Sequence, residues 1–144
     1  MAERQSRELL ELLVDPGMEA IERTRLRVLQ HFGPIPGFGD SLRTVYAVEI
    51  VLEEWLTNVF RHGTGSPVAL RVSVDADGIL MRFVDDGPPF DATERPLPAR
   101  PSNLDEARPG GLGLFLIHHY AKSWHCARQD GRNVMHIAID TGRR

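Results

Sequence analysis

EEWLTNVFRHG, residues 53–63, lies in the clearest amphipathic pattern of the chain. Apolar residues recur at helical spacing over residues 41–62, and this periodicity predicts an amphipathic helix. Glu54 and Asn58 flank the apolar stripe four residues apart, so they lie on the same side of the helix. A solvated helix edge is the simpler explanation of either residue alone. The apolar stripe consists of Val45, Val48, Leu52, Trp55, Leu56 and Val59.

Composition and charge limit the classes of protein to which the chain can belong. Of its 144 residues, 42% are apolar and 26% are charged, so we expect a single domain over residues 1–144 with a sizeable core. The formal net charge of −3 gives no general attraction for nucleic acid, and we expect no direct nucleic-acid partner. The single cysteine excludes an internal disulfide. The charged beginning of the chain and the lack of a long apolar run predict a cytoplasmic protein without membrane contact.

Hydrophobic periodicity also predicts the other elements of the first half. We expect a helix at about residues 18–32, while residues 7–14, RELLELLV, fit either a short helix or an opening strand. Either Asp40 or Ser41 can cap the helix of residues 41–62. Alternation over residues 68–74 predicts a strand, and Asp77-Gly78 predicts a hairpin turn with a return strand after it.

The second half of the chain begins with a segment that cannot be regular. Six prolines lie within residues 86–109, and so long a loop in a small domain is usually functional or mobile. We expect a helix at about residues 112–122 to follow it, and then two strands at about 123–128 and 133–139. This order predicts an α+β fold, a two-layer sandwich with a largely antiparallel mixed sheet and helices on one face.

Two further clusters have residue types suited to ligand binding. FVDDGPPFD, residues 83–91, places Asp85 at a strand end, where a carboxylate can accept a hydrogen bond from an amine. Gly87 would let a flat ring approach the backbone there, although a plain turn is the simpler explanation of this block alone. RPGGLGLFLI, residues 108–117, places glycines before an apolar helix, whose free N–H groups suit phosphate. It lacks the lysine and serine or threonine of a P-loop.

The order of the three clusters resembles that of the ATP-binding domains of the GHKL superfamily, which gyrase, sensor histidine kinases and MutL share. The spacing of Glu54, Thr57 and Asn58, the following His62-Gly63, and the blocks DDGPPFD and GGLGLFLI are most similar to one branch. That branch is the anti-sigma-factor serine/threonine kinases of bacterial partner-switching modules. The similarity runs over about residues 18–139, and residues 91–109 stand in the place of a lid.

The resemblance implies roles for the matching polar residues. Glu54 would act as general base on an incoming hydroxyl, and Asn58 would hold Mg²⁺ through its side-chain oxygen, a ligand type that suits this hard cation. Asp85 would accept a hydrogen bond from the adenine amine of ATP, and Gly87 would allow the ring to lie close. His62 would orient Asn58 or contact phosphate, and a helix C-terminal cap explains it equally well.

The resemblance also assigns the glycine-rich block. Arg108 is the nearest basic residue to the terminal phosphate, one position from where the family pattern places one. A second departure is Arg132-Asn133, where many superfamily members have Gly-Thr, and we expect this change to matter little at the phosphate edge. The phosphate-side hinge of the lid would be formed by Gly110, Gly111, Leu112, Gly113 and Leu114.

The resemblance implies an ATP- and Mg²⁺-dependent protein-serine/threonine kinase. Its substrate would be a STAS-type anti-anti-sigma factor, it would hold a sigma factor inactive, and it would form a homodimer. The alternative is a nucleotide-gated module that binds a partner without phosphorylating it, which the position of Arg108 favours and the presence of Glu54 disfavours. We do not expect the catalytic half of a sensor histidine kinase, because few residues precede the ATP-binding region to supply a helical hairpin with a phospho-acceptor histidine.

Overall fold

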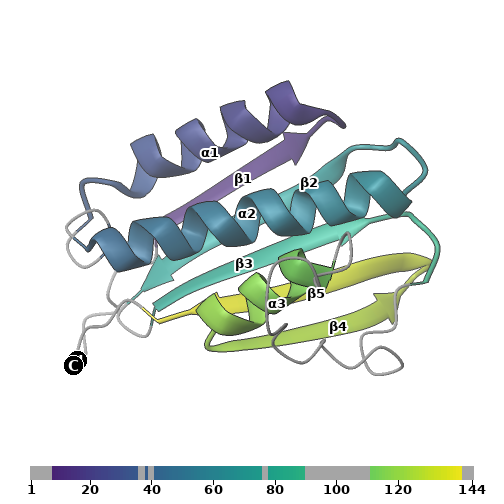
Figure 1. The fold of residues 1–144 in the computed structure, drawn as a ribbon. Helices are drawn as coiled ribbons and strands as arrows, with labels where there is room; N and C mark the ends of the chain where they lie inside the picture. The colour runs from purple at the N-terminus through teal and green to yellow at the C-terminus, as the bar shows by residue number, and fades with distance from the viewer. Residues whose placement is uncertain (1–7, 36–37, 39–40, 76–77, 90–110, 141–144) are drawn as a thin grey trace, which may run out of the picture.

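The chain forms two layers, a sheet and a set of helices on one of its faces (Figure 1). The computed structural model describes residues 8–35, 38, 41–75, 78–89 and 111–140. Within them the five strands are in the order β1-β2-β3-β5-β4, and every pairing is antiparallel. The predicted α+β sandwich is confirmed, and its described sheet is antiparallel where a mixed one was expected. The elements are β1 (Glu8–Val14), α1 (Met18–Phe32), α2 (Leu42–His62), β2 (Val68–Asp75), β3 (Gly78–Asp85), α3 (Gly111–Tyr120), β4 (Ser123–Gln129) and β5 (Arg132–Ile139).

The helix α2 forms where the apolar periodicity predicts it and lies at the centre of the helical layer. The Ser41 side chain accepts a hydrogen bond from the Thr44 N–H at 3.2 Å and so caps the first turn. All residues of the predicted stripe are buried except Val45, which is half-buried. Trp55 lies edge-on to Phe83 of β3, with the ring centroids 6.5 Å apart. Burial therefore fixes α2 on the sheet, and its flanks contact α1 and α3.

The strand β1 resolves the ambiguous segment RELLELLV. It pairs with β2 along its whole length, with Leu10 opposite Val72. Leu10 is buried under the helices, whereas Leu9 and Leu13 are exposed on the opposite face of the sheet, which no described helix covers. This alternation is the period of a strand, and α1 packs over β1 and contributes to its burial.

The boundary between α3 and β4 is set by the sheet. The sequence pattern suggests a helix to about residue 122, but α3 ends at Tyr120. The Lys122 N–H donates to the Ala138 carbonyl oxygen at 2.7 Å, and this contact draws the chain alongside β5. In the turn that follows β4, Asp130 and Gly131 have φ angles of 53° and 75°, as a tight hairpin turn requires.

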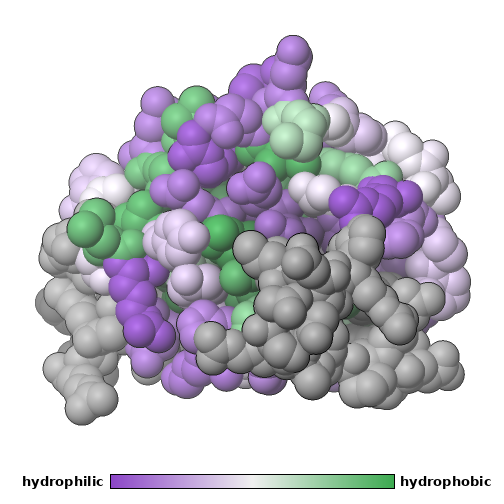
Figure 2. Space-filling view, in the orientation of Figure 1, coloured by the Kyte–Doolittle hydropathy of each residue, from purple (hydrophilic) through white to green (hydrophobic). Residues whose placement is uncertain are grey.

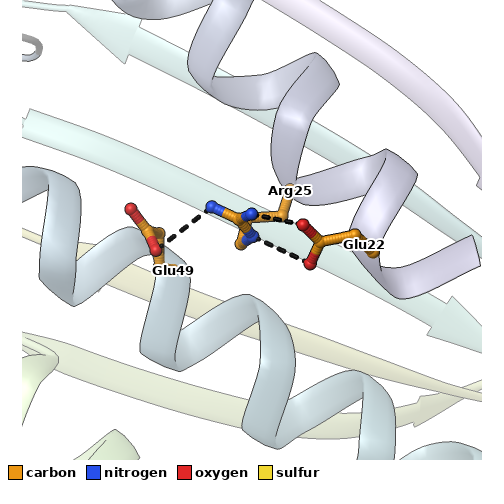
Figure 3. A network of polar contacts seen from close by, with 3 residues as sticks. All are labelled: Glu22, Arg25 and Glu49. Atoms are coloured by element: carbon orange, nitrogen blue, oxygen red, sulfur yellow. Dashed lines mark hydrogen bonds and ion pairs between the residues drawn. The ribbon is translucent and has the colours of Figure 1, made fainter. Parts of the chain in front are cut away.

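The outer surface of the helical layer is mixed in polarity. Figure 2 shows hydrophilic side chains interspersed with apolar ones on this face. Arg25 of α1 hydrogen-bonds to Glu22 of the same helix and, at 3.3 Å, to Glu49 of α2 (Figure 3). Among the helices of the described residues, none combines the length and the apolar character needed to cross a bilayer.

Candidate functional site

The first group of candidate residues lies along one flank of α2. Glu54, Asn58 and His62 are spaced four residues apart, so the helix places them one above another. Glu54 and Asn58 are half-buried, and His62 is exposed in the last turn. Their neighbours Trp55 and Val59 are buried in the core, which holds this flank on rigid backbone.

The Glu54 carboxylate packs against Gly113 in the first turns of α3. A Cβ added to Gly113 would collide with the Glu54 Oε2 atom, so the close approach of the two helices depends on glycine at this position. Burial raises the pKa of Glu54 above its ordinary value, the negative charge of Glu53 raises it further, and Arg61 lowers it. A carboxylate held in this way is a better base than an exposed one.

The second group lies where β3 ends. Asp85 is buried, with 8% of its surface exposed, and its Oδ1 atom accepts a hydrogen bond from the Gly87 N–H at 2.9 Å. A Cβ on Gly87 would lie 2.9 Å from that Oδ1 atom and 3.4 Å from the Gly63 Cα atom. The turn after β3 therefore packs against the C-terminal end of α2, and this contact brings the second group of candidate residues beside the first group on α2.

A side-chain contact joins the same two ends. Thr64, which follows α2, donates a hydrogen bond to the Asp86 Oδ1 atom at 3.0 Å. Both residues are exposed, so the contact lies on the rim of the site.

Two residues of the second hairpin, Asn133 and Arg128, complete the surroundings of Asp85, and the sequence pattern assigned neither of them to the site. The Asn133 Nδ2 atom donates to the Asp85 Oδ1 atom at 3.0 Å, and Arg128 donates to the Gly87 carbonyl oxygen at 2.8 Å. We expected the change at Asn133 to matter little at the phosphate edge, and the structure places it beside the Asp85 carboxylate. The sequence does contain one indication of this role. Asn133 alternates with Met135 and Ile137 along β5, so its side chain is on the buried face of the strand, where a polar residue is unusual.

The glycine-rich block is only partly within the described residues. Arg108, Gly110 and the proposed lid, residues 91–109, lie outside them. Gly111 and Leu112 form the beginning of α3. Gly113 and Leu114 are half-buried, and Leu114 packs against the hydrophobic core.

The described residues fit magnesium through a single protein ligand. They contain no group of three histidine, cysteine or acidic side chains that could hold a metal ion by themselves. No described residue hydrogen-bonds to the half-buried Asn58 side chain, whose amide oxygen is of the ligand type that Mg²⁺ takes together with nucleotide phosphates. A site of this kind depends on the nucleotide for its remaining ligands.

Comparison with known proteins identifies the family. Residues 21–139 match the histidine kinase-like ATPase domain family, which is most of the chain. The chain belongs to this family. Serine/threonine-protein kinase BtrW of Bordetella bronchiseptica (strain ATCC BAA-588 / NCTC 13252 / RB50) is 29% identical to this ATPase domain over 97 residues, 65% of this chain and 68% of that protein. The structure of Acinetobacter baumannii histidine kinase AdeS covers 94% of this chain and 70% of its own, with a TM-score of 0.52 and 13% identity, which shows likeness of fold.

These findings confirm the superfamily that the motifs indicated. Membership of an ATPase domain family indicates that this domain binds ATP, and its similarity to BtrW supports a kinase-like function.

Proposed function

We propose that this ATPase domain is an ATP- and Mg²⁺-dependent protein-serine/threonine kinase. The observation that carries the proposal is the half-buried Glu54 carboxylate, which lies against Gly113 and one helical turn from Asn58. Transfer of a phosphoryl group to a hydroxyl needs a residue that orients and deprotonates the nucleophile, and positive charge at the phosphates. A base with a raised pKa and a magnesium-binding amide on one rigid helix meet these needs.

In the proposed reaction, the hydroxyl oxygen of a substrate serine or threonine attacks the γ-phosphorus of ATP. Glu54 accepts the hydroxyl proton, and the bond from the γ-phosphorus to the β–γ bridging oxygen breaks, so that ADP leaves with that oxygen. Asp85 accepts a hydrogen bond from the adenine amine and thereby sets the position of the nucleotide. Mg²⁺ held by Asn58 would supply charge neutralisation at the phosphates.

We assign the substrate to the STAS class of anti-anti-sigma proteins, and we propose that a homodimer of this chain also holds a sigma factor inactive. The similarity of the blocks DDGPPFD and GGLGLFLI to those of anti-sigma-factor kinases supports this assignment. Nucleotide and phosphorylation state would select between the two partners, which requires that each partner bind one state more tightly than the other.

The test is transfer of labelled phosphate from Mg-ATP to the cognate STAS protein. Glu54→Ala is expected to lower the transfer rate by about 10²- to 10⁴-fold, the usual contribution of a general base, with little change in ATP affinity. Arg43→Ala is the control, because Arg43 is exposed in the first turn of the same helix and is not among the charges that shift the pKa of Glu54. Normal transfer by Glu54→Ala would remove Glu54 from the mechanism. A nucleotide-dependent complex without any phosphoprotein would instead support the non-catalytic binding module.

A further inference from the structure

Three polar residues form a row across three neighbouring strands. Asp85 of β3 is directly opposite Asn133 of β5, and Asn133 is directly opposite Arg128 of β4. Asp85 and Asn133 are buried, with 8% and 4% of their surfaces exposed, whereas Arg128 lies at the edge of the sheet and is exposed. Hydrogen bonds join all three, and buried polar residues in such a row are costly unless they are satisfied.

The contacts of Asn133 fix the orientation of its amide. The Asn133 Oδ1 atom accepts a hydrogen bond from Arg128 at 3.1 Å, while its Nδ2 atom donates to the Asp85 Oδ1 atom at 3.0 Å and to the Pro88 carbonyl oxygen at 2.9 Å. The reversed amide would turn its N–H groups toward the guanidinium and its oxygen toward two acceptors. Arg128, at the oxygen end of the amide, and the two acceptors at its nitrogen end together determine which way Asn133 points, and Asn133 in turn donates to Asp85.

This arrangement leaves the two oxygens of Asp85 unequal. Oδ1 accepts from both the Gly87 N–H and the Asn133 amide, whereas no described residue donates to Oδ2. A carboxylate held by two donors on one oxygen cannot rotate freely and presents the other oxygen as a single, oriented acceptor. Such an acceptor suits an amine and disfavours a carbonyl oxygen, because two acceptors would then face each other.

The same residues hold the turn that follows Asp85. Arg128 donates to the Gly87 carbonyl oxygen at 2.8 Å, and Asn133 donates to the next carbonyl, that of Pro88. The turn is thereby tied to the β4–β5 hairpin while Gly87 packs against Gly63 at the end of α2. The position of the backbone beside the base-reading carboxylate thus depends on two side chains from distant sequence.

We propose that Arg128 and Asn133 form a base clamp, a pair of positioning residues that sets the preference of this domain for 6-aminopurine over 6-oxopurine nucleotides. The clamp acts through Asp85 and need not touch the nucleotide. The inference rests on the proposed nucleotide site and adds to it the residues that determine which base is accepted. Selectivity of this kind arises when a polar group is fixed so that the wrong base leaves it unpaired.

The experiment is calorimetric titration of the full chain with Mg-ATP and with Mg-ITP, which carries an oxygen in place of the amine. We expect the wild type to prefer ATP by about a hundredfold, the scale of one hydrogen bond to a charged group. Asn133→Leu, which keeps the branched shape of the side chain and removes its amide, should reduce this ratio below about tenfold by weakening the binding of ATP and not that of ITP. Arg128→Met should reduce it several-fold, and Arg132→Met, which removes an exposed arginine of the same hairpin, should leave it unchanged.

The outcomes separate the clamp from the site on which it rests. If the folded wild type binds neither nucleotide, both the nucleotide site and the clamp are overturned. If the wild type prefers ATP and both variants keep that ratio, the clamp alone is overturned. If the variants weaken the binding of ATP and of ITP equally, the two residues only stabilise the fold, and this result also contradicts the clamp. Arg128 is exposed, so Arg128→Met provides the test even where thermal unfolding shows that Asn133→Leu is unstable.

Discussion

Replacement of Gly113 by alanine is expected to slow phosphoryl transfer by displacing the Glu54 carboxylate. The added Cβ would collide with the Glu54 Oε2 atom, and the carboxylate must retreat by about 1 Å to restore an ordinary van der Waals separation. A misplacement of about 1 Å can slow a positioned reaction by about a hundredfold. That factor corresponds to about 2.7 kcal/mol of lost transition-state stabilisation.

The stability of the same variant gives a second, independent readout. Alanine in a helix interior is favoured over glycine by about 0.5–1 kcal/mol, and because Gly113 lies in the first turn of α3, this range is the upper limit of the gain that Gly113→Ala would give if it met no obstacle. With Glu54 present, the collision offsets that gain. In a Glu54→Ala background the obstacle is absent, and Gly113→Ala should then raise the free energy of unfolding by up to about that amount. Chemical denaturation of the two single variants and the double variant measures this coupling.

The assay is single-turnover transfer from Mg-ATP to the STAS substrate, with ATP affinity measured in parallel. We expect the rate to fall about a hundredfold while ATP affinity changes less than about threefold. Loss of ATP binding together with transfer would show that Gly113 acts at the phosphates and not on Glu54. Transfer at the wild-type rate, with additive stability effects, would refute the proposed contact between Gly113 and the base.

Two further perturbations test the electrostatics of the helical layer. Because burial raises the pKa of Glu54, its ionised form is disfavoured in the folded state, and Glu54→Gln should stabilise the protein at neutral pH. This advantage should decline as the pH falls through the raised folded-state pKa and be gone once the pH is below the ordinary glutamate pKa, as measured by thermal unfolding across pH. For the same reason, the apparent pKa of the acid limb of the transfer rate should lie above the ordinary glutamate pKa, and Arg61→Gln should raise this apparent pKa further. An apparent pKa at the ordinary value would contradict the burial of Glu54. The Arg25–Glu49 contact between α1 and α2 is partly exposed, so a double-mutant cycle with Arg25→Gln and Glu49→Gln should give a coupling of about 0.5 kcal/mol that weakens in high salt, and a salt-independent value would contradict an ion pair.

Local sequence patterns were sufficient to predict several of the helices and strands. The helix α2 followed from a stripe at helical spacing with Ser41 available as a cap, and the four strands of the two hairpins followed from alternation and turn residues. The order of the three clusters was enough to indicate the ATPase superfamily, which residues 21–139 confirm. These features are readable because their physical causes act within a few residues of the chain.

The tertiary structure decided what depends on distant partners. Residues 7–14 satisfied two local patterns, and only pairing with β2 at the sheet edge made them a strand. The end of α3 at Tyr120 depends on a hydrogen bond from Lys122 to β5. Local propensity does not depend on contacts between distant segments, so it could predict neither the strand at residues 7–14 nor the end of α3.

The candidate site shows the same division in its side chains. Glu54, Asn58 and Asp85 could be selected from sequence because the blocks that contain them resemble those of the GHKL superfamily, whereas each block alone has a simpler structural explanation. The close packing of Glu54 against Gly113 could not be predicted from sequence, and neither could the row of hydrogen bonds that joins Asp85 to Asn133 and Arg128. They arise from helix packing and from the order β3-β5-β4, which bring together segments far apart in the chain. Burial of the common core fixes that arrangement, and residue spacing within one segment does not predict it.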